Sequence, residues 1–268
     1  MQIRLETIGR PRKGYSILEL MACVLSRTLK DGTTVGTGAG SAVARAACRL
    51  AQLTHAPNLN YLAGGSGAVN PLLDPLVDSS CDYTNYICES VVTMSDVIGS
   101  IPSGTTDLFF CGGLQIDRYG NVNLSVIGDY NKPRLRGPGS AALPLMAGAR
   151  HFIIFMTDHS PRSFVEKVDF RTAPGFLEGG ESWRLAKAQG LIGGEGPLLV
   201  ISPLAVLDFE EESKTMRLLS VHPGKTVEEV VAATGFSLMV PEHVPETIPP
   251  SPEELQFLRS FDTDGILS

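Results

Sequence analysis

Two glycine-rich stretches in the first third of the chain could present backbone amides to a ligand. One of them is Gly36-Thr37-Gly38-Ala39-Gly40-Ser41, between a predicted strand and a predicted helix. Free N–H groups at the start of a helix bind anions such as phosphate. A tight turn that lets a helix approach a sheet is the alternative. The stretch has neither a clean GxGxxG pattern nor a GK[ST] pair, which argues against a dinucleotide and against a P-loop nucleotide.

The other stretch is Ala63-Gly64-Gly65-Ser66-Gly67-Ala68, directly after a predicted strand. Its glycines, Gly64, Gly65 and Gly67, leave amides open to a ligand, and the hydroxyl of Ser66 is a candidate nucleophile. The stretch lacks the GxSxG pattern, however, and no His or Asp can be assigned to Ser66. A serine that only shapes the turn is the alternative.

Residues 112–140 form the longest segment with side chains suited to bind a ligand. They are dense in Gly, Asn, Asp and Tyr, which is typical of a series of ordered turns. Arg134 and Arg136 could hold a carboxylate or phosphate in bidentate fashion. Candidate binding groups in the same segment are the amides of Gly137 and Gly139, which could face a developing oxyanion, and the side chains of Asn121, Asn123 and Ser140. Capping of turns is the alternative role for the two asparagines.

The elements around these segments predict an α/β fold. Ser16 with Glu19 forms a capping box that starts a helix, and Gly32 is placed to end it. A strand at residues 33–35, an alanine-rich helix at residues 41–53 and a strand at residues 58–63 follow. Short apolar runs then predict further buried strands at residues 107–111, 151–157, 198–202, 205–209 and 216–221.

Two more capping boxes predict helices near the end of the chain. One starts at Thr226 with Glu229, and the other at Ser251, where Pro252 occupies the first helical position. Residues 240–250 contain four prolines, which indicates a linker. We expect a single domain over residues 1–268, with a mixed or parallel sheet flanked by helices and with residues 241–268 as a proline-rich linker and C-terminal helix.

Composition excludes several classes of protein. The net charge of −7 comes without a basic stripe, which argues against nucleic-acid binding. No apolar run approaches the roughly 20 residues that span a bilayer, and no signal-like segment begins the chain. Five widely spaced cysteines without a CxxC pair indicate reduced thiols in the cytoplasm, and the histidines form no metal-binding pattern. We expect neither a membrane partner nor a metal.

Several long runs resemble the β subunit of glutaconate CoA-transferase, a member of the CoA-transferase family. Residues 112–130, GGLQIDRYGNVNLSVIGDY, and residues 132–142, KPRLRGPGSAA, resemble its GGAQIDPYGNVNST-type run and glycine-rich loop. Residues 162–170, RSFVEKVDF, with Pro174-Gly175 after them, are similar to its RRFVEKVDF…SPG segment. Residues 219–224 and 227–236 resemble its HPGVTVEEV…TGF stretch. The resemblance extends from about Ser16 to the final helix.

The resemblance implies an acyl-CoA substrate, an α-type partner subunit in an α2β2 assembly, and an active site where the two subunits meet. Coenzyme A is then part of the substrate, and no permanently bound cofactor is expected. In the family's transferases a β-subunit glutamate, in a motif such as E-S-G, attacks the thioester. Here Gly65 stands at that position, and Glu89, the next carboxylate with a plausible position, is too far along the chain to replace it. Ser140 and Ala142 also depart from the Gly and Asn common in the family.

Relatives without the glutamate act on CoA thioesters as decarboxylases or as hydrolases that open a steroid ring. The resemblance therefore implies a lyase or hydrolase subunit, in which amides near Gly65, Gly137 and Gly139 stabilise an enolate oxygen. The acid or base would come from the α subunit, from a water, or from Asp117 or Tyr119. Two alternatives stay open: a true transferase with its nucleophile elsewhere, and a non-catalytic partner that stabilises an active α-like subunit.

Overall fold

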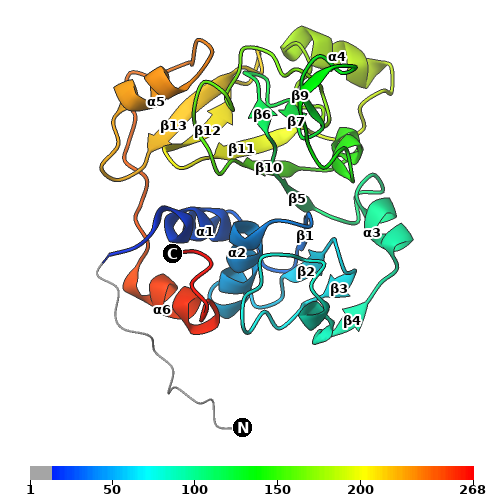
Figure 1. The fold of residues 1–268 in the computed structure, drawn as a ribbon, viewed down its shortest axis with the longest axis vertical. Coiled ribbons are helices and arrows are strands. Elements are labelled where there is room, and N and C mark those ends of the chain that lie inside the picture. The colour runs from blue at the N-terminus through cyan, green and yellow to red at the C-terminus, as the bar shows by residue number, and fades with distance from the viewer. Residues whose placement is uncertain (1–13) are drawn as a thin grey trace. The chain divides into compact units, whose positions relative to one another are not determined.

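The computed structural model describes residues 14–268 (Figure 1). Internal contacts divide them into two compact units, the first with residues 14–94 and 249–268 and the second with residues 95–248. The last helix thus belongs with the first third of the chain. The prediction of one domain over residues 1–268 stays a prediction, and its first 13 residues lie outside the described ones.

The first unit contains three helices whose starts were predicted. They are α1 (Ile17–Arg27), α2 (Ala42–Leu53) and α6 (Pro252–Phe261), and they pack against one another. The capping boxes of α1 and α6 are confirmed: the Ser16 and Ser251 hydroxyls each accept a hydrogen bond from the amide three residues on, and the Glu19 and Glu254 carboxylates each accept one from the serine amide. The predicted end of the first helix was wrong, because α1 stops at Arg27 and Gly32 lies in the turn before the next strand.

The strands of the first unit follow one another in the order β1-β2-β3-β4. β1 (Thr34–Thr37) and β2 (Asn60–Ala63) are parallel, which confirms the two strands predicted on either side of α2. Two short strands that the sequence did not reveal, β3 (Ala68–Val69) and β4 (Ser90–Val91), then add on in antiparallel fashion. A 3-10 turn, η1 (Tyr83–Tyr86), lies between β3 and β4 in the chain.

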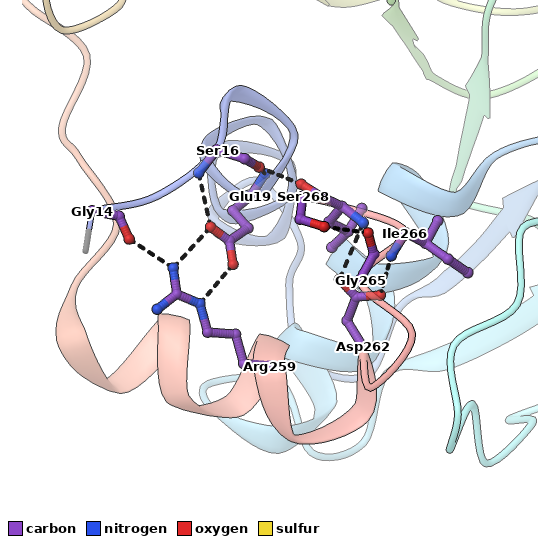
Figure 2. Close-up of polar contacts among 9 residues, drawn as sticks. Gly14, Ser16, Glu19, Arg259, Asp262, Gly265, Ile266 and Ser268 are labelled. Carbon is purple, nitrogen blue, oxygen red and sulfur yellow. Dashed lines mark hydrogen bonds and ion pairs between the residues drawn. The ribbon is translucent and has the colours of Figure 1, made fainter. Parts of the chain in front are cut away.

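An ion pair joins α6 to the start of α1. The guanidinium of Arg259 donates to both carboxylate oxygens of Glu19, at 2.7 and 3.0 Å, and to the carbonyl of Gly14 at 2.7 Å (Figure 2). The Glu19 side chain is only 3% exposed, and its carboxylate also caps α1 at the Ser16 amide. Ser16 Oγ in turn donates to the carbonyl of Leu267. The two ends of the first unit are therefore held together by polar contacts around one buried carboxylate.

The second unit contains the five other strands that the sequence predicted. They are β5 (Leu108–Cys111), β10 (Phe152–Phe155), β11 (Pro197–Ile201), β12 (Ala205–Phe209) and β13 (Met216–Val221). β5, β10 and β11 are parallel, and β12 and β13 extend the sheet in antiparallel fashion. Phe152, Ile154, Val200 and Leu207 are buried in its core, and Val230 joins them from α5 (Val227–Ala233). The α/β class with a mixed sheet and flanking helices is confirmed.

Shorter elements complete the second unit. They are the helices α3 (Met94–Ser100) and α4 (Gly180–Ala188), the 3-10 turn η2 (Leu143–Ala147), and two hairpins, β6 (Gln115–Ile116) with β7 (Val122–Asn123) and β8 (Val126–Gly128) with β9 (Pro133–Arg136). The sequence predicted turns where the hairpins lie, and it did not predict α3 or α4. The capping box of α5, Thr226 with Glu229, is confirmed.

Two buried histidines in the second unit hold a polar network together. His159 contacts the hydroxyls of Ser202 and Thr234 at 2.7 and 3.1 Å, and His222 contacts the Thr247 hydroxyl at 3.0 Å and the Ser202 carbonyl at 2.8 Å. Burial lowers the pKa of His159 to about 4 and also lowers the pKa of His222. Both rings are therefore neutral at pH 7.

Acid should destabilise the protein through these histidines. An unfolded histidine takes up a proton near pH 6.5, whereas folded His159 resists it until about pH 4. The stability that depends on the neutral ring is complete above pH 6.5 and is lost as the pH falls toward 4, on the order of 3 kcal/mol for His159. Urea unfolding between pH 7.5 and 4 measures this loss. We expect a shallower pH slope for His159→Gln and an unchanged slope for the exposed His243→Gln; equal slopes in all three proteins would contradict the assignment.

Candidate functional site

The two glycine-rich turns of the first unit are linked by one serine. They follow β1 and β2, so both lie at the carboxyl ends of parallel strands, where open α/β sheets bind ligands. The Ser80 amide donates to the Ala39 carbonyl at 2.8 Å, and its hydroxyl donates to the Gly38 carbonyl at 3.0 Å. The same hydroxyl accepts from the Gly65 amide at 2.9 Å. Residues 79–82 therefore tie the two turns together.

Gly65 has no room for a side chain in this arrangement. A Cβ atom added there would lie 2.5 Å from Cys81 Sγ, 2.5 Å from Ser80 Oγ and 3.0 Å from the Cys81 amide nitrogen. Real Cβ atoms essentially never approach other atoms this closely. Cys81 is a free, exposed cysteine, so its thiol occupies the space into which a side chain at position 65 would begin to extend.

The amides of the second turn are already used within the chain. Gly64 donates to the Thr37 carbonyl at 3.0 Å, and Ser66 and Gly67 both donate to the Ala63 carbonyl, at 3.2 and 2.9 Å. With the Gly65 amide bonded to Ser80, the expectation that this turn presents free N–H groups is wrong. The Ser66 hydroxyl accepts from the Ala68 amide at 3.3 Å, as expected of a serine that shapes a turn. Its role as a nucleophile stays a prediction that these contacts do not favour.

The first turn, not the second, offers unused amides. The N–H groups of Gly38 and Ala39, and those of residues 42–44 in the first turn of α2, make no hydrogen bond within residues 14–268. The side chain of the N-cap residue Ser41 does not cap α2, because its hydroxyl donates to the Gly38 carbonyl at 2.7 Å. Such a helix start attracts negative charge. The sequence indicated this loop as a possible anion-binding turn, but the candidate site residues were predicted in the second glycine-rich turn and in residues 117–140.

Asp117 in the second unit holds a turn together. Its carboxylate accepts from the Tyr119 amide at 3.0 Å, from the Asn121 amide at 3.1 Å and from the Asn121 side-chain nitrogen at 2.9 Å. Burial raises the pKa of this carboxyl. The predicted acid–base role remains a prediction, but an aspartate that accepts several bonds from its own turn is not free to meet a substrate.

The two asparagines predicted as binding groups are fully buried. Asn121 donates to the Leu177 carbonyl at 2.7 Å and accepts from the Gly175 amide at 2.9 Å. Asn123 donates to Gln115 Oε1 at 2.7 Å and to the Val126 carbonyl at 2.6 Å. The Asn121 side chain therefore joins segments that are distant in sequence, and the Asn123 side chain holds its own turn to β6, which fits the structural alternative better than ligand binding.

The remaining predicted residues of the second unit differ in how available they are. Tyr119 packs against the cluster of Phe176 and Trp183, as a structural ring does. The Gly137 amide donates to the Ser125 carbonyl at 2.9 Å and the Gly139 amide to the Leu124 carbonyl at 3.4 Å, so neither is free for an oxyanion.

Three predicted residues on or just after β9 are exposed. Arg136 donates to the Tyr130 carbonyl at 2.9 Å and lies over the Tyr130 ring at 5.2 Å. The side chains of Arg134 and Ser140 make no hydrogen bond or ion pair within residues 14–268. Arg134 is thus the predicted anion-binding residue that the structure leaves most available.

A family model for Coenzyme A transferase matches residues 18–233, which is most of the chain. This chain belongs to the Coenzyme A transferase family. Its relatives include the B subunit of 3-oxoadipate CoA-transferase from Pseudomonas knackmussii, with 36% identity over 92% of this chain and 94% of the relative. The B subunit of glutaconate CoA-transferase from Acidaminococcus fermentans is 31% identical over 91% of each chain. The sequence resemblance to glutaconate CoA-transferase β subunits is confirmed.

Relatives in the Coenzyme A transferase family with other activities match nearly as much of the chain. The cholesterol ring-cleaving hydrolase IpdB subunit of Mycobacterium tuberculosis is 26% identical over 90% of this chain and 92% of the relative. The solved glutaconate CoA-transferase of Acidaminococcus fermentans superimposes with a TM-score of 0.83 at 27% identity, and the decarboxylase AibA/AibB with 0.80 at 27%. These two structures cover 94% of this chain and are themselves covered to 97%. Family membership alone therefore leaves the reaction open.

Two other kinds of feature are absent from the part of the chain that is described. No group of three or more His, Cys, Asp or Glu side chains gathers there in a way that could hold a metal ion. None of the helices in residues 14–268 has both the length and the apolar character needed to cross a membrane.

Proposed function

We propose that this chain is the B-type subunit of a heteromeric enzyme that acts on an acyl-CoA thioester as a decarboxylase, another lyase or a C–C hydrolase. Coenzyme A enters as part of the substrate, and no permanently bound cofactor is needed. An A-type subunit of the same family is the partner, in an assembly with two copies of each, in the cytoplasm. The named relatives support a partner, because they are B subunits or, like AibA/AibB, complexes of two kinds of chain.

The crowding at Gly65 is the observation that carries this proposal. The resemblance implies that the family's transferases attack the thioester with a glutamate, and we propose that Gly65 stands at the position of that glutamate. Here the position has no side chain, and Ser80 Oγ and Cys81 Sγ fill the space beside it. A covalent acyl-glutamyl intermediate at this position is therefore impossible.

Without a covalent intermediate the thioester carbonyl can still act as an electron sink. When the bond between the α carbon and the departing group breaks, its electron pair stays on the α carbon. The thioester carbonyl takes up this charge as an enolate, and the enolate oxygen needs hydrogen-bond donors. The unused amides of Gly38 and Ala39 and the uncapped start of α2 support that role in place of Gly65, Gly137 and Gly139. The acid that protonates the carbon is then best supplied by the partner subunit, because Asp117 and Tyr119 are engaged in their own turn and cluster.

A second candidate is a true transferase with its nucleophile elsewhere. It is favoured by the two relatives of more than 30% identity, 3-oxoadipate and glutaconate CoA-transferase, which are both transferases by name.

A third candidate is a non-catalytic partner that stabilises an active A-type subunit. In that case the Arg134→Ala variant, which removes an exposed and unengaged guanidinium, would leave the activity of the complex unchanged.

Consumption of acyl-CoA without an acceptor acid tests the proposal. The complex of this chain with its A-type subunit should release carbon dioxide or a ring-opened product from a panel of carboxylated and cyclic acyl-CoA thioesters. Mass spectrometry of the CoA species and capture of carbon dioxide measure both products. Turnover that occurs only when acetate or another acid is supplied, with radioactive label moving from that acid into acyl-CoA, would establish the transferase instead.

A further inference from the structure

The segment that follows the Gly65 turn combines acidic charge with exposed apolar side chains. Between residues 56 and 117 the chain has no Lys, Arg or His, and residues 72–94 carry four acids, Asp74, Asp78, Asp82 and Glu89. Six large apolar side chains of the same segment are exposed: Leu72, Tyr83, Tyr86, Ile87, Val91 and Met94. Tyr83 is 79% exposed and Ile87 63%. Concentrations of this kind on a soluble chain mark interaction sites.

Hydrogen bonds bring parts of this segment together in the first unit. The Leu72 amide donates to the Ile87 carbonyl at 2.9 Å, and the Asn70 side chain donates to Glu89 at 2.9 Å. β3 pairs with β4 from Val69 to Ser90, and β4 is the last strand of its sheet, so its outer edge has no strand partner in residues 14–268. We call this region, residues 72–94, the 72–94 surface. An open edge beside exposed aromatic and aliphatic side chains is a place where another chain can add.

We propose that the 72–94 surface is where the A-type subunit docks; this rests on the proposed function. Charge decides between this occupant and a second copy of the chain. In a two-fold symmetric pair the same patch faces itself, which would set four acids against four acids. A partner with an apolar face and Lys or Arg at its rim fits instead. Because Ser80 and Cys81 lie within this surface and contact the Gly65 turn, the docked subunit would lie next to the turns after β1 and β2.

Binding measured with the co-expressed A-type subunit from the same genome tests this placement. Deuterium exchange of amides in residues 72–94 should slow when the A-type subunit is added. The double variant Tyr83→Ser/Ile87→Ser should bind it about 30-fold or more weakly, as loss of a central aromatic anchor does. Asp78→Lys should also weaken binding, and less so at high salt.

The matched control is Leu185→Ser/Leu191→Ser, which removes two exposed apolar side chains of the second unit. Its affinity should stay near wild type, and circular dichroism melts should show all variants folded. Unchanged affinity of the Tyr83/Ile87 variant together with unchanged exchange in residues 72–94 would overturn the placement, as would a surface that mediates self-association of this chain.

The two proposals fail in different ways. If the complex is active and the 72–94 variants do not change the affinity between the subunits, the docking surface is wrong and the proposed function is unaffected. If the complex forms through this surface but turns over no acyl-CoA, the proposed function is wrong and the docking surface is unaffected.

Discussion

Replacement of Gly65 with glutamate should destabilise the protein and should not produce a CoA-transferase. The new Cβ would lie 2.5 Å from both Ser80 Oγ and Cys81 Sγ, so these two side chains would have to leave their present positions. Overpacking of this kind costs about 1–3 kcal/mol. The shift would also break the bond from the Gly65 amide to Ser80, which ties the two turns together. Urea unfolding measures the first effect, and exchange of labelled acetate into acyl-CoA by the complex measures the second.

Gly40→Ala is the matched control for this prediction, because a Cβ at position 40 meets nothing within 4 Å. Its stability should stay within about 1 kcal/mol of wild type. Combining Gly65→Ala with Cys81→Gly should recover part of the stability lost in Gly65→Ala, because one of the two crowding side-chain atoms is gone while Ser80 keeps its bonds to Gly38 and Gly65. A Gly65→Glu variant that is as stable as wild type and exchanges acetate would show that the space exists and would refute our explanation.

Arg259→Met should destabilise the first unit by about 3–5 kcal/mol. Arg259 forms an ion pair with Glu19, whose side chain is 3% exposed, and Arg259→Met takes this guanidinium away from a buried carboxylate. The change also removes the hydrogen bond to the Gly14 carbonyl. Chemical unfolding followed by circular dichroism measures the loss.

Two further variants show whether the loss of stability in Arg259→Met comes from the buried Glu19 carboxylate or from breaking an ion pair of any kind. Arg171→Met breaks the pair with Glu178, whose side chain is 61% exposed, and should cost at most about 1 kcal/mol. The double variant Arg259→Met/Glu19→Leu removes both charges, so it should be more stable than Arg259→Met alone. Equal losses in Arg259→Met and Arg171→Met would contradict the special role of Glu19.

The sequence predicted those elements whose signals are local. Each capping box joins residues three apart, so Ser16, Thr226 and Ser251 could be recognised from the sequence alone. Buried strands such as β10 appear as continuous apolar runs. β3, β4 and the helices α3 and α4 were missed because two-residue strands and short helices carry too little periodicity to be distinguished from turns.

The site was harder to predict because its contacts are long-range. The sequence alone led us to expect the glutamate position at Gly65, which stays a prediction, whereas the crowding around Gly65 comes from Ser80 and Cys81, 15 and 16 residues later. The amides of Gly65, Gly137 and Gly139 looked free for the same reason: their acceptors, Ser80 Oγ and the carbonyls of Ser125 and Leu124, are set by the tertiary fold. For Asn121 and Asn123 the sequence left a binding role and a structural role open, and only the tertiary fold shows that both side chains are buried and hydrogen-bonded within the chain.

The most direct test of the central claim is a search for a covalent intermediate on this chain. The complex is incubated with acyl-CoA, treated with borohydride or hydroxylamine, and the chain is analysed by intact mass and peptide mapping. Our account predicts acyl-CoA turnover with no acyl or CoA adduct, and no reduced or hydroxamate-modified carboxylate, on this chain. A modified glutamate or aspartate formed at the rate of turnover would contradict it and would show that the chain is a transferase after all.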